Sequence, residues 1–162
     1  MDIFTHALAP ALLAHNFVGR KKAFSRKDLV LIGIAGALPD LLNPHLSLDA
    51  RMHSWSHGLP GWLVISLLFV GLSKIRRVGL STRVAVIMAF AYLLHMVCDA
   101  ISGGIDWLYP SGSFVWGEYW VDPTLWVPLD IVLVLIAYFQ FRIIPMRRKL
   151  AQARRDDASP PA

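Results

Sequence analysis

The stretch TRVAVIMAFAYLLHMVCDAI, at residues 82–101, decides how this sequence folds. It is apolar along nearly all of its length and, at roughly 1.5 Å per residue, long enough to cross the roughly 30 Å hydrocarbon core of a membrane as a helix. His95 and Asp99 interrupt it near its end, four residues apart and therefore on one face of a helix. Ionisable side chains are costly inside a bilayer and usually mark function. The stretch therefore predicts a membrane helix with a functional group near one end.

Four other apolar segments flank this stretch, at about residues 3–19, 28–46, 55–73 and 124–145. The last two are long enough for a spanning helix, which needs roughly 20 mostly apolar residues. The first two are short or interrupted by prolines (Pro10, Pro39 and Pro44), so we expect them to be tilted or re-entrant. The predicted fold is an all-α, polytopic membrane bundle of about five apolar helices.

The positive charge predicts the orientation of this bundle. Apart from Arg51, every Lys and Arg falls in one of three clusters, Arg20–Lys27, Lys74–Arg83 and Arg142–Arg155. Cytoplasmic loops retain Lys and Arg, so all three clusters are expected on the cytoplasmic side. Five crossings then place the N-terminus outside and the C-terminus in the cytoplasm. We divide the chain into a membrane-embedded domain, residues 1–146, and a basic, disordered cytoplasmic tail, residues 147–162.

Composition excludes several classes of protein. The 162 residues are 56% apolar, above the roughly 45–50% of soluble domains. The net charge of +5 lies at the ends of apolar segments and no nucleic-acid-binding motif is present, so membrane lipids are the expected partner and nucleic acid is not. A single cysteine, Cys98, excludes an internal disulfide and a metal site built from cysteines alone.

The segment SGGIDWLYPSGSFVWGEYWVDP, at residues 102–123, is too polar and too rich in glycine and proline to span a membrane. It carries Trp107, Trp116 and Trp120. Tryptophan is enriched where a membrane meets water, so the segment predicts an aromatic belt at the outer interface. A lid or a lipid-binding loop is the alternative interpretation.

Histidine and aspartate recur at a spacing of four residues, in Asp2 and His6, in His53 and His57, and in His95 and Asp99. With Asp40, these residues are all expected within about two helical turns of the outer boundary. Imidazole nitrogen and carboxylate oxygen without thiolate suit zinc or, alternatively, manganese. The predicted metal ligands are His6, Asp40, His57, His95 and Asp99.

Other polar residues have simpler interpretations. His15 is expected at the cytoplasmic interface and His45 in a solvated outer turn. Asp130 is either a partner of the ligands or an interfacial residue. His53 and Asp99 are the candidates for catalysis, since a surplus carboxylate or an imidazole can act as a general base.

The sequence resembles a family of bacterial inner-membrane-associated proteins described as metal-dependent hydrolases, some of them as LexA-binding. The motifs that carry the resemblance are M-D-x-x-T-H at Met1–His6, L-P-D at Leu38–Asp40, H-S-W-S-H-G at His53–Gly58, H-x-x-x-D-x-x-S-x-G at His95–Gly104 and L-Y-P at Leu108–Pro110. The resemblance implies hydrolase activity in the bacterial inner membrane and identifies no substrate.

Three positions depart from the family's pattern. Leu42 stands where members often have a second acid, and Gly103 stands where they usually have a proline. Met52 occupies the position of the first histidine of the family's central motif, with His53 one residue closer to His57. His57 is therefore a better-supported ligand than His53.

These observations favour a membrane-embedded, metal-dependent hydrolase that acts near the outer face on an amphipathic substrate, such as a lipid ester or phosphoester. The alternatives are a regulatory or assembly protein without enzymatic activity, and a small transporter that relays protons through His and Asp. A transporter needs a polar path to the cytoplasmic side, and the inner halves of the apolar segments offer little for one.

Overall fold

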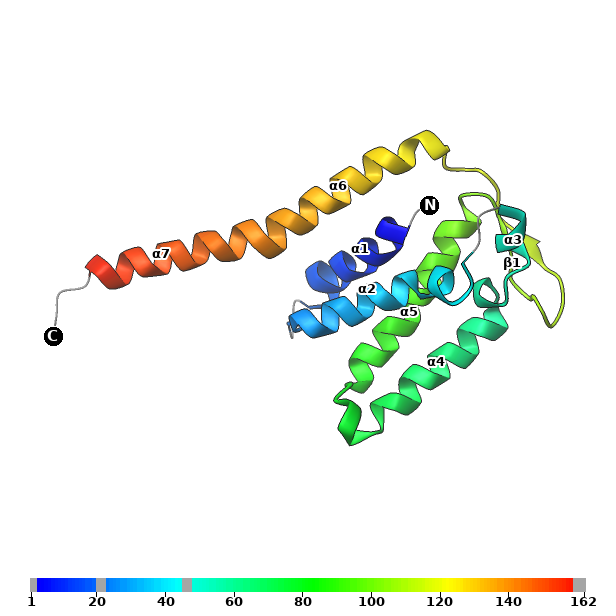
Figure 1. The fold of residues 1–162 in the computed structure, drawn as a ribbon, viewed down its shortest axis with the longest axis horizontal. Coiled ribbons are helices and arrows are strands. Elements are labelled where there is room, and N and C mark those ends of the chain that lie inside the picture. The colour runs from blue at the N-terminus through cyan, green and yellow to red at the C-terminus, as the bar shows by residue number, and fades with distance from the viewer. Residues whose placement is uncertain (1–2, 20–22, 45–47, 159–162) are drawn as a thin grey trace.

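A computed structural model describes residues 3–19, 23–44 and 48–158 of the chain. The described chain is helical except for connecting loops and one short hairpin, which confirms the all-α class (Figure 1). The main helices are α1 (Ile3–Leu13), α2 (Arg26–Leu42), α4 (Leu59–Ser73), α5 (Thr82–Ala100), α6 (Trp126–Tyr138) and α7 (Ile144–Ala158). Shorter elements are α3 (Leu48–Met52), η2 (Trp55–His57), η3 (Arg76–Val78), η4 (Pro123–Leu125) and the antiparallel strands β1 (Ile105–Asp106) and β2 (Val115–Trp116).

Two π-helical segments extend this set. The segment η1 (Ala14–Val18) continues α1, and η5 (Phe139–Ile143) joins α6 to α7 without a break. In Figure 1 the helices α6 and α7 form one long rod that runs past the other helices. Residues 147–158 therefore continue a helix, where the sequence analysis expected a disordered tail.

The prediction of five spanning helices is not confirmed. Only Thr82–Ala100, with 19 residues, and Trp126–Arg155, with 30, are both long and apolar enough to cross a membrane among the described residues. The helix α4 has 15 residues and α2 has 17. The apolar patterns at these positions were correctly assigned to helices, but α2 ends at Leu42, before Pro44, and α4 begins at Leu59, after η2, so both helices are shorter than the hydrophobic runs.

Local sequence signals explain where these helices begin. Ser25 accepts a hydrogen bond from the Asp28 N–H, and the Asp28 carboxylate accepts one from the Ser25 N–H, so α2 begins with a capping box. Ser81 accepts a hydrogen bond from the Val84 N–H at the start of α5. Pro60 lies in the first turn of α4, where no N–H is needed.

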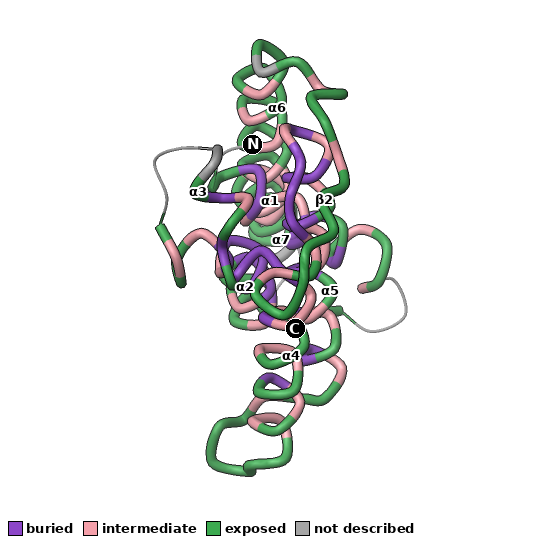
Figure 2. The backbone as a smooth tube through the Cα atoms, turned by 90° about the vertical axis from the view of Figure 1, so that its right-hand side faces the viewer, coloured by how far each residue is buried: buried purple, intermediate pink, exposed green. Residues whose placement is uncertain are grey.

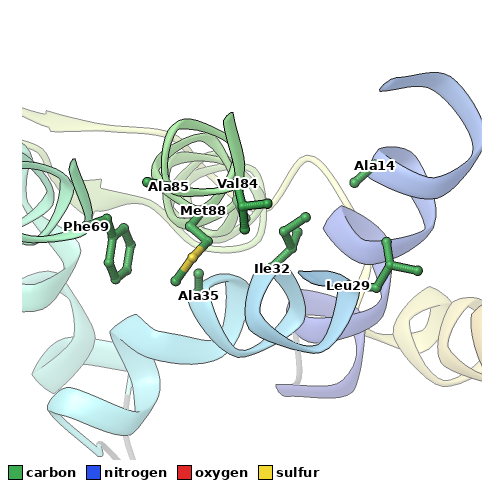
Figure 3. Packing of buried hydrophobic residues seen from close by; sticks show 9 residues of the cluster. Ala14, Leu29, Ile32, Ala35, Phe69, Val84, Ala85 and Met88 are labelled. Carbon is green, nitrogen blue, oxygen red and sulfur yellow. The ribbon is translucent and has the colours of Figure 1, made fainter. Parts of the chain in front are cut away.

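The core lies between α2 and α5, with α1 and α4 packed on either side. Small and medium side chains fill it, among them Ile32, Ala35, Phe69, Ala85 and Met88 (Figure 3). By contrast, no residue of α6 is buried (Figure 2), and apolar side chains such as Val127, Ile131 and Leu135 are exposed. A helix that is apolar all round and exposed is typical of contact with lipid.

Candidate metal centre

Four side chains from three parts of the chain meet at one end of the core. We call this group, Asp40 of α2, His57 of η2, and His95 and Asp99 of α5, the His/Asp cluster. Each residue offers one ligand atom, and these atoms all lie within 4.8 Å of one another. The side chains of His57, His95 and Asp99 are almost completely buried, whereas that of Asp40 is 22% exposed. The cluster is therefore open to its surroundings on the side of Asp40.

The geometry of the His/Asp cluster centres on Asp99. Its Oδ2 lies 3.2 Å from Nε2 of His57 and 3.2 Å from Nε2 of His95. The two Nε2 atoms are 3.1 Å apart. Asp40 Oδ1 lies 3.4 Å from Nε2 of His57 and 3.6 Å from Nε2 of His95. Two imidazoles and two carboxylates therefore direct their polar atoms at one small volume.

Backbone contacts orient the ring of His95. Its Nδ1 lies 2.7 Å from the carbonyl oxygen of Gly36. A carbonyl can only accept, so Nδ1 carries the hydrogen, and in the neutral ring the lone pair is on Nε2, which faces the cluster. A metal-binding histidine is commonly oriented by such a contact on its other nitrogen.

Hydroxyl groups hold His57 in a similar way. Its Nδ1 lies 3.1 Å from Ser54 Oγ and 3.2 Å from Ser56 Oγ. Ser56 donates to the Pro39 carbonyl, and Ser54 accepts from the Asn43 side chain. Both serine oxygens can thus accept from Nδ1–H of His57, an arrangement that leaves Nε2 available toward Asp40 and Asp99.

His6 stands beside the cluster on α1. Its ring stacks on that of His95 with 3.7 Å between centroids, and its Nε2 lies 3.2 Å from Asp99 Oδ1. The residue is buried, yet neither ring nitrogen has a hydrogen-bond partner of good geometry among the described residues. His6 is thus close enough to be a further ligand, although it is outside the set of four. Its expected companion, Asp2, lies outside the described residues.

His53 does not join the cluster, contrary to the expectation that it acts there. It is exposed and contacts the ring of Tyr109 edge-on, with 5.9 Å between centroids. The spacing of four from His57 implied a shared helix face, but the chain is extended at Ser54 and then forms the 3-10 helix η2. The two histidines therefore point in different directions.

The remaining predicted positions lie away from the cluster. His15 is exposed in η1 and packs against Phe141, in line with its simpler interpretation. Asp130 of α6 accepts a hydrogen bond from the Thr5 hydroxyl, one residue before His6, and does not reach the cluster. His45 lies outside the described residues.

Arg51 had no predicted role. Its guanidinium is buried, with Nη1 3.2 Å from Asp99 Oδ1 and Nη2 3.3 Å from the carbonyl oxygens of Asp99 and Ser102. Arg51 thus contacts Oδ1 of Asp99, beside His6, and leaves Oδ2 to His57 and His95. One feature of the sequence could have pointed to Arg51: every other Lys and Arg belongs to a basic cluster, and Arg51 does not.

Residues 102–123 form a loop rich in tryptophan, which we call the Trp-rich loop. It packs directly against the element that carries His57. The Leu59 N–H donates to the Trp107 carbonyl at 2.7 Å, and a Cβ at Gly58 would lie 2.2 Å from the Tyr109 carbonyl oxygen. Within the loop, hydrogen bonds from the Phe114 and Leu108 N–H groups hold the pKa of Asp106 below its ordinary value. The loop is therefore a folded element fixed beside His57, at the edge of the His/Asp cluster.

Comparisons with known proteins identify a family and no closer relative. A family model described as YdjM inner membrane protein matches residues 1–155. No curated protein matches the chain, and no solved structure does. The matched region includes all four residues of the His/Asp cluster, as well as Arg51 and the Trp-rich loop.

Proposed function

Because this chain belongs to the YdjM inner membrane protein family, we propose that it is a membrane-embedded, metal-dependent hydrolase with its site at the outer face. The observation that carries the proposal is the convergence of Asp40, His57, His95 and Asp99. Perturbed and converging ionisable groups at one buried point are typical of functional sites.

The donor set fits a divalent ion. Two imidazole Nε2 atoms 3.1 Å apart, facing two carboxylates, gather lone pairs and negative charge in a buried space. A buried carboxylate without a compensating charge is costly, and a cation shared among these groups removes that cost. Nitrogen and oxygen donors without thiolate suit zinc, with manganese as the alternative.

Three residues of the cluster are suited to bind the ion, and the fourth is suited to transfer a proton. His57, His95 and Asp99 are held by Ser54 and Ser56, by Gly36 and by Arg51, which makes them suitable ligands of fixed orientation. The ion supplies Lewis acidity, which polarises an ester or phosphoester bond and lowers the pKa of water. Asp40 is the most accessible carboxylate of the cluster and is best placed to take a proton from water.

The distribution of charge supports an outward-facing site. On α2, Arg26 is at one end and Asp40 at the other; on α5, Arg83 and Asp99 have the same relation. Basic ends are expected in the cytoplasm, so the cluster belongs to the opposite side, with the C-terminal helix inside. A site beside the exposed Trp116 and Trp120, at the depth of lipid headgroups, favours an amphipathic substrate such as a lipid ester or phosphoester.

A proton-coupled transporter is less well supported. It needs a polar path from the cluster to the basic end, and the space between α2 and α5 is filled there by apolar side chains such as Ile32, Ala35 and Met88. A regulatory or assembly protein without enzymatic activity remains the alternative, and it requires the cluster to bind metal for structure alone.

The test is hydrolysis by the purified protein, reconstituted into lipid and supplied with zinc or manganese. We expect release of product from a lipid phosphoester or ester by the parent protein and by Arg77→Gln, whose arginine is exposed in η3 away from the cluster. Asp40→Asn should retain metal and lose turnover. Metal bound at full stoichiometry, with no hydrolysis of any lipid ester or phosphoester, would favour the structural alternative.

A further inference from the structure

A second site lies at the basic end of the molecule, away from the His/Asp cluster. Arg26 and Asp40 are at opposite ends of α2, fourteen residues and therefore roughly 20 Å apart along the helix. Between α1, α2 and η5 there is an apolar groove of about 470 Å³, lined by residues such as Leu8, Val30 and Ile34. Its volume falls within the roughly 300–1,000 Å³ of small-molecule sites.

A polar pocket of about 320 Å³ adjoins this groove. Arg26, Leu29 and Phe141 line both spaces, so the two lie side by side. The pocket adds polar side chains that the groove lacks, and these are His15, Asn16, Gln140 and Arg148. An apolar groove beside a polar, basic pocket offers an amphiphile a place for its acyl chain and a place for its headgroup.

The backbone is irregular where it surrounds this pocket. The two π-helical segments of the described chain, η1 and η5, both contribute to its wall, η1 through His15 and Asn16 and η5 through Gln140 and Phe141. Asn16 donates to Gln140 at 3.1 Å and to the Leu12 carbonyl at 2.9 Å, which joins the two segments. Such π-helical turns occur frequently at functional sites.

The charge of the pocket is positive. Arg26 and Arg148 are exposed, and neither forms an ion pair with a carboxylate among the residues that the structure describes. Asp28 is the nearest acid along α2, and its carboxylate is taken up by the capping box with Ser25. Two guanidinium groups without an acidic partner are suited to a phosphate.

We infer that this site binds one anionic phospholipid, with an acyl chain in the groove and its phosphate between Arg26 and Arg148. Arg26 lines both the groove and the pocket. Arginine at a membrane interface commonly packs its aliphatic stem on apolar surface and keeps its charged end among polar groups. Basic pockets between membrane helices bind anionic headgroups in the same way. The inference stands apart from the proposed hydrolase activity, because it shares no residue with the His/Asp cluster.

The test is native mass spectrometry of the full chain, released from micelles that contain equal amounts of phosphatidylglycerol and phosphatidylcholine. The parent protein should retain phosphatidylglycerol preferentially. Arg26→Gln and Arg148→Gln should each reduce this retention about fivefold, since one basic residue near an anionic surface contributes about 1 kcal/mol. Arg77→Gln is the matched control, because Arg77 of η3 is exposed and lines neither space.

A second pair of variants tests the groove itself. Val30 is exposed on its wall, so Val30→Trp should fill the groove and reduce retention of both lipids, whereas Val64→Trp on the exposed face of α4 should not. The inference is overturned if Arg77→Gln matches Arg26→Gln, which would indicate only diffuse charge. It is equally overturned if Val30→Trp leaves retention unchanged, or if it alters the oligomeric state instead, which would assign the groove to a second copy of the chain.

Discussion

The Arg51 guanidinium lies 3.2 Å from Oδ1 of Asp99 and donates as well to the Asp99 backbone carbonyl. One side chain from the segment between α2 and α4 therefore neutralises the buried carboxylate and caps the end of α5. A positive charge at a helix C-terminus also complements the helix dipole. This contact fixes the orientation of Asp99, so that its other oxygen, Oδ2, faces His57 and His95.

Removing this charge should destabilise the protein strongly. In Arg51→Gln the Asp99 carboxylate keeps its burial and loses the guanidinium that neutralises it, and breaking a buried ion pair in this way costs about 3–5 kcal/mol. We expect a clear fall in the midpoint of thermal unfolding, measured by circular dichroism in detergent. Arg77→Gln, at an exposed position, should change stability by about 0.5 kcal/mol or less. Equal midpoints for the two variants would contradict this role of Arg51.

The close approach of α1 and α2 at Gly36 gives a second prediction. A Cβ at this position would lie 2.2 Å from the His6 carbonyl oxygen and 2.6 Å from Pro10 Cγ. Gly36→Ala should therefore push α1 away from α2, at a cost of about 1–3 kcal/mol, and weaken metal binding, because the Gly36 carbonyl also orients His95.

Gly71→Ala provides the control for this change. Gly71 lies in α4 with nothing within 4 Å of the added Cβ. Alanine there should be neutral or stabilise the helix by up to about 1 kcal/mol. The account of Gly36 is wrong if both alanine variants unfold at the temperature of the parent protein.

The protonation of Asp106 should determine how the Trp-rich loop responds to acid. Hydrogen bonds from the Phe114 and Leu108 N–H groups lower its pKa in the folded protein. A lowered folded pKa means that its stabilisation is present above the unfolded pKa of about 3.9 and is lost as the pH falls through the folded value. Tryptophan fluorescence should report loosening of the loop in that acidic range. Asp106→Asn should remove this pH dependence while keeping an acceptor; an unchanged acid transition would show that another group controls the loop.

Much of the site was predictable from residue spacing. The pair His95 and Asp99 lies in a regular helix, where a separation of four residues puts side chains on one face, and the structure places Nε2 of His95 3.2 Å from Asp99 Oδ2. Asp40 and His57 were expected near the same end of their segments and meet there. Apolar runs also located the helices α1, α2, α4, α5 and α6.

Three features could not be predicted from the sequence, because they depend on irregular backbone or on tertiary contacts. The extended Ser54 turns His53 away from His57, and no periodicity signals such a break. The contacts of Arg51 with Asp99 and Ser102 join residues about fifty positions apart, so local pattern carries no information about them. The basic segment after residue 146 is helical because it continues α6 through η5, which outweighs its polar composition.

The central claim is that the His/Asp cluster holds a divalent cation, and elemental analysis of the protein purified from membranes tests it most directly. The parent protein and His15→Ala should carry zinc or manganese in stoichiometric amounts, because His15 lies outside the cluster. His57→Ala, His95→Ala and Asp99→Asn should each lose most of it. A parent protein that is folded yet free of metal after incubation with either ion, or cluster variants that retain as much metal as His15→Ala, would contradict the account.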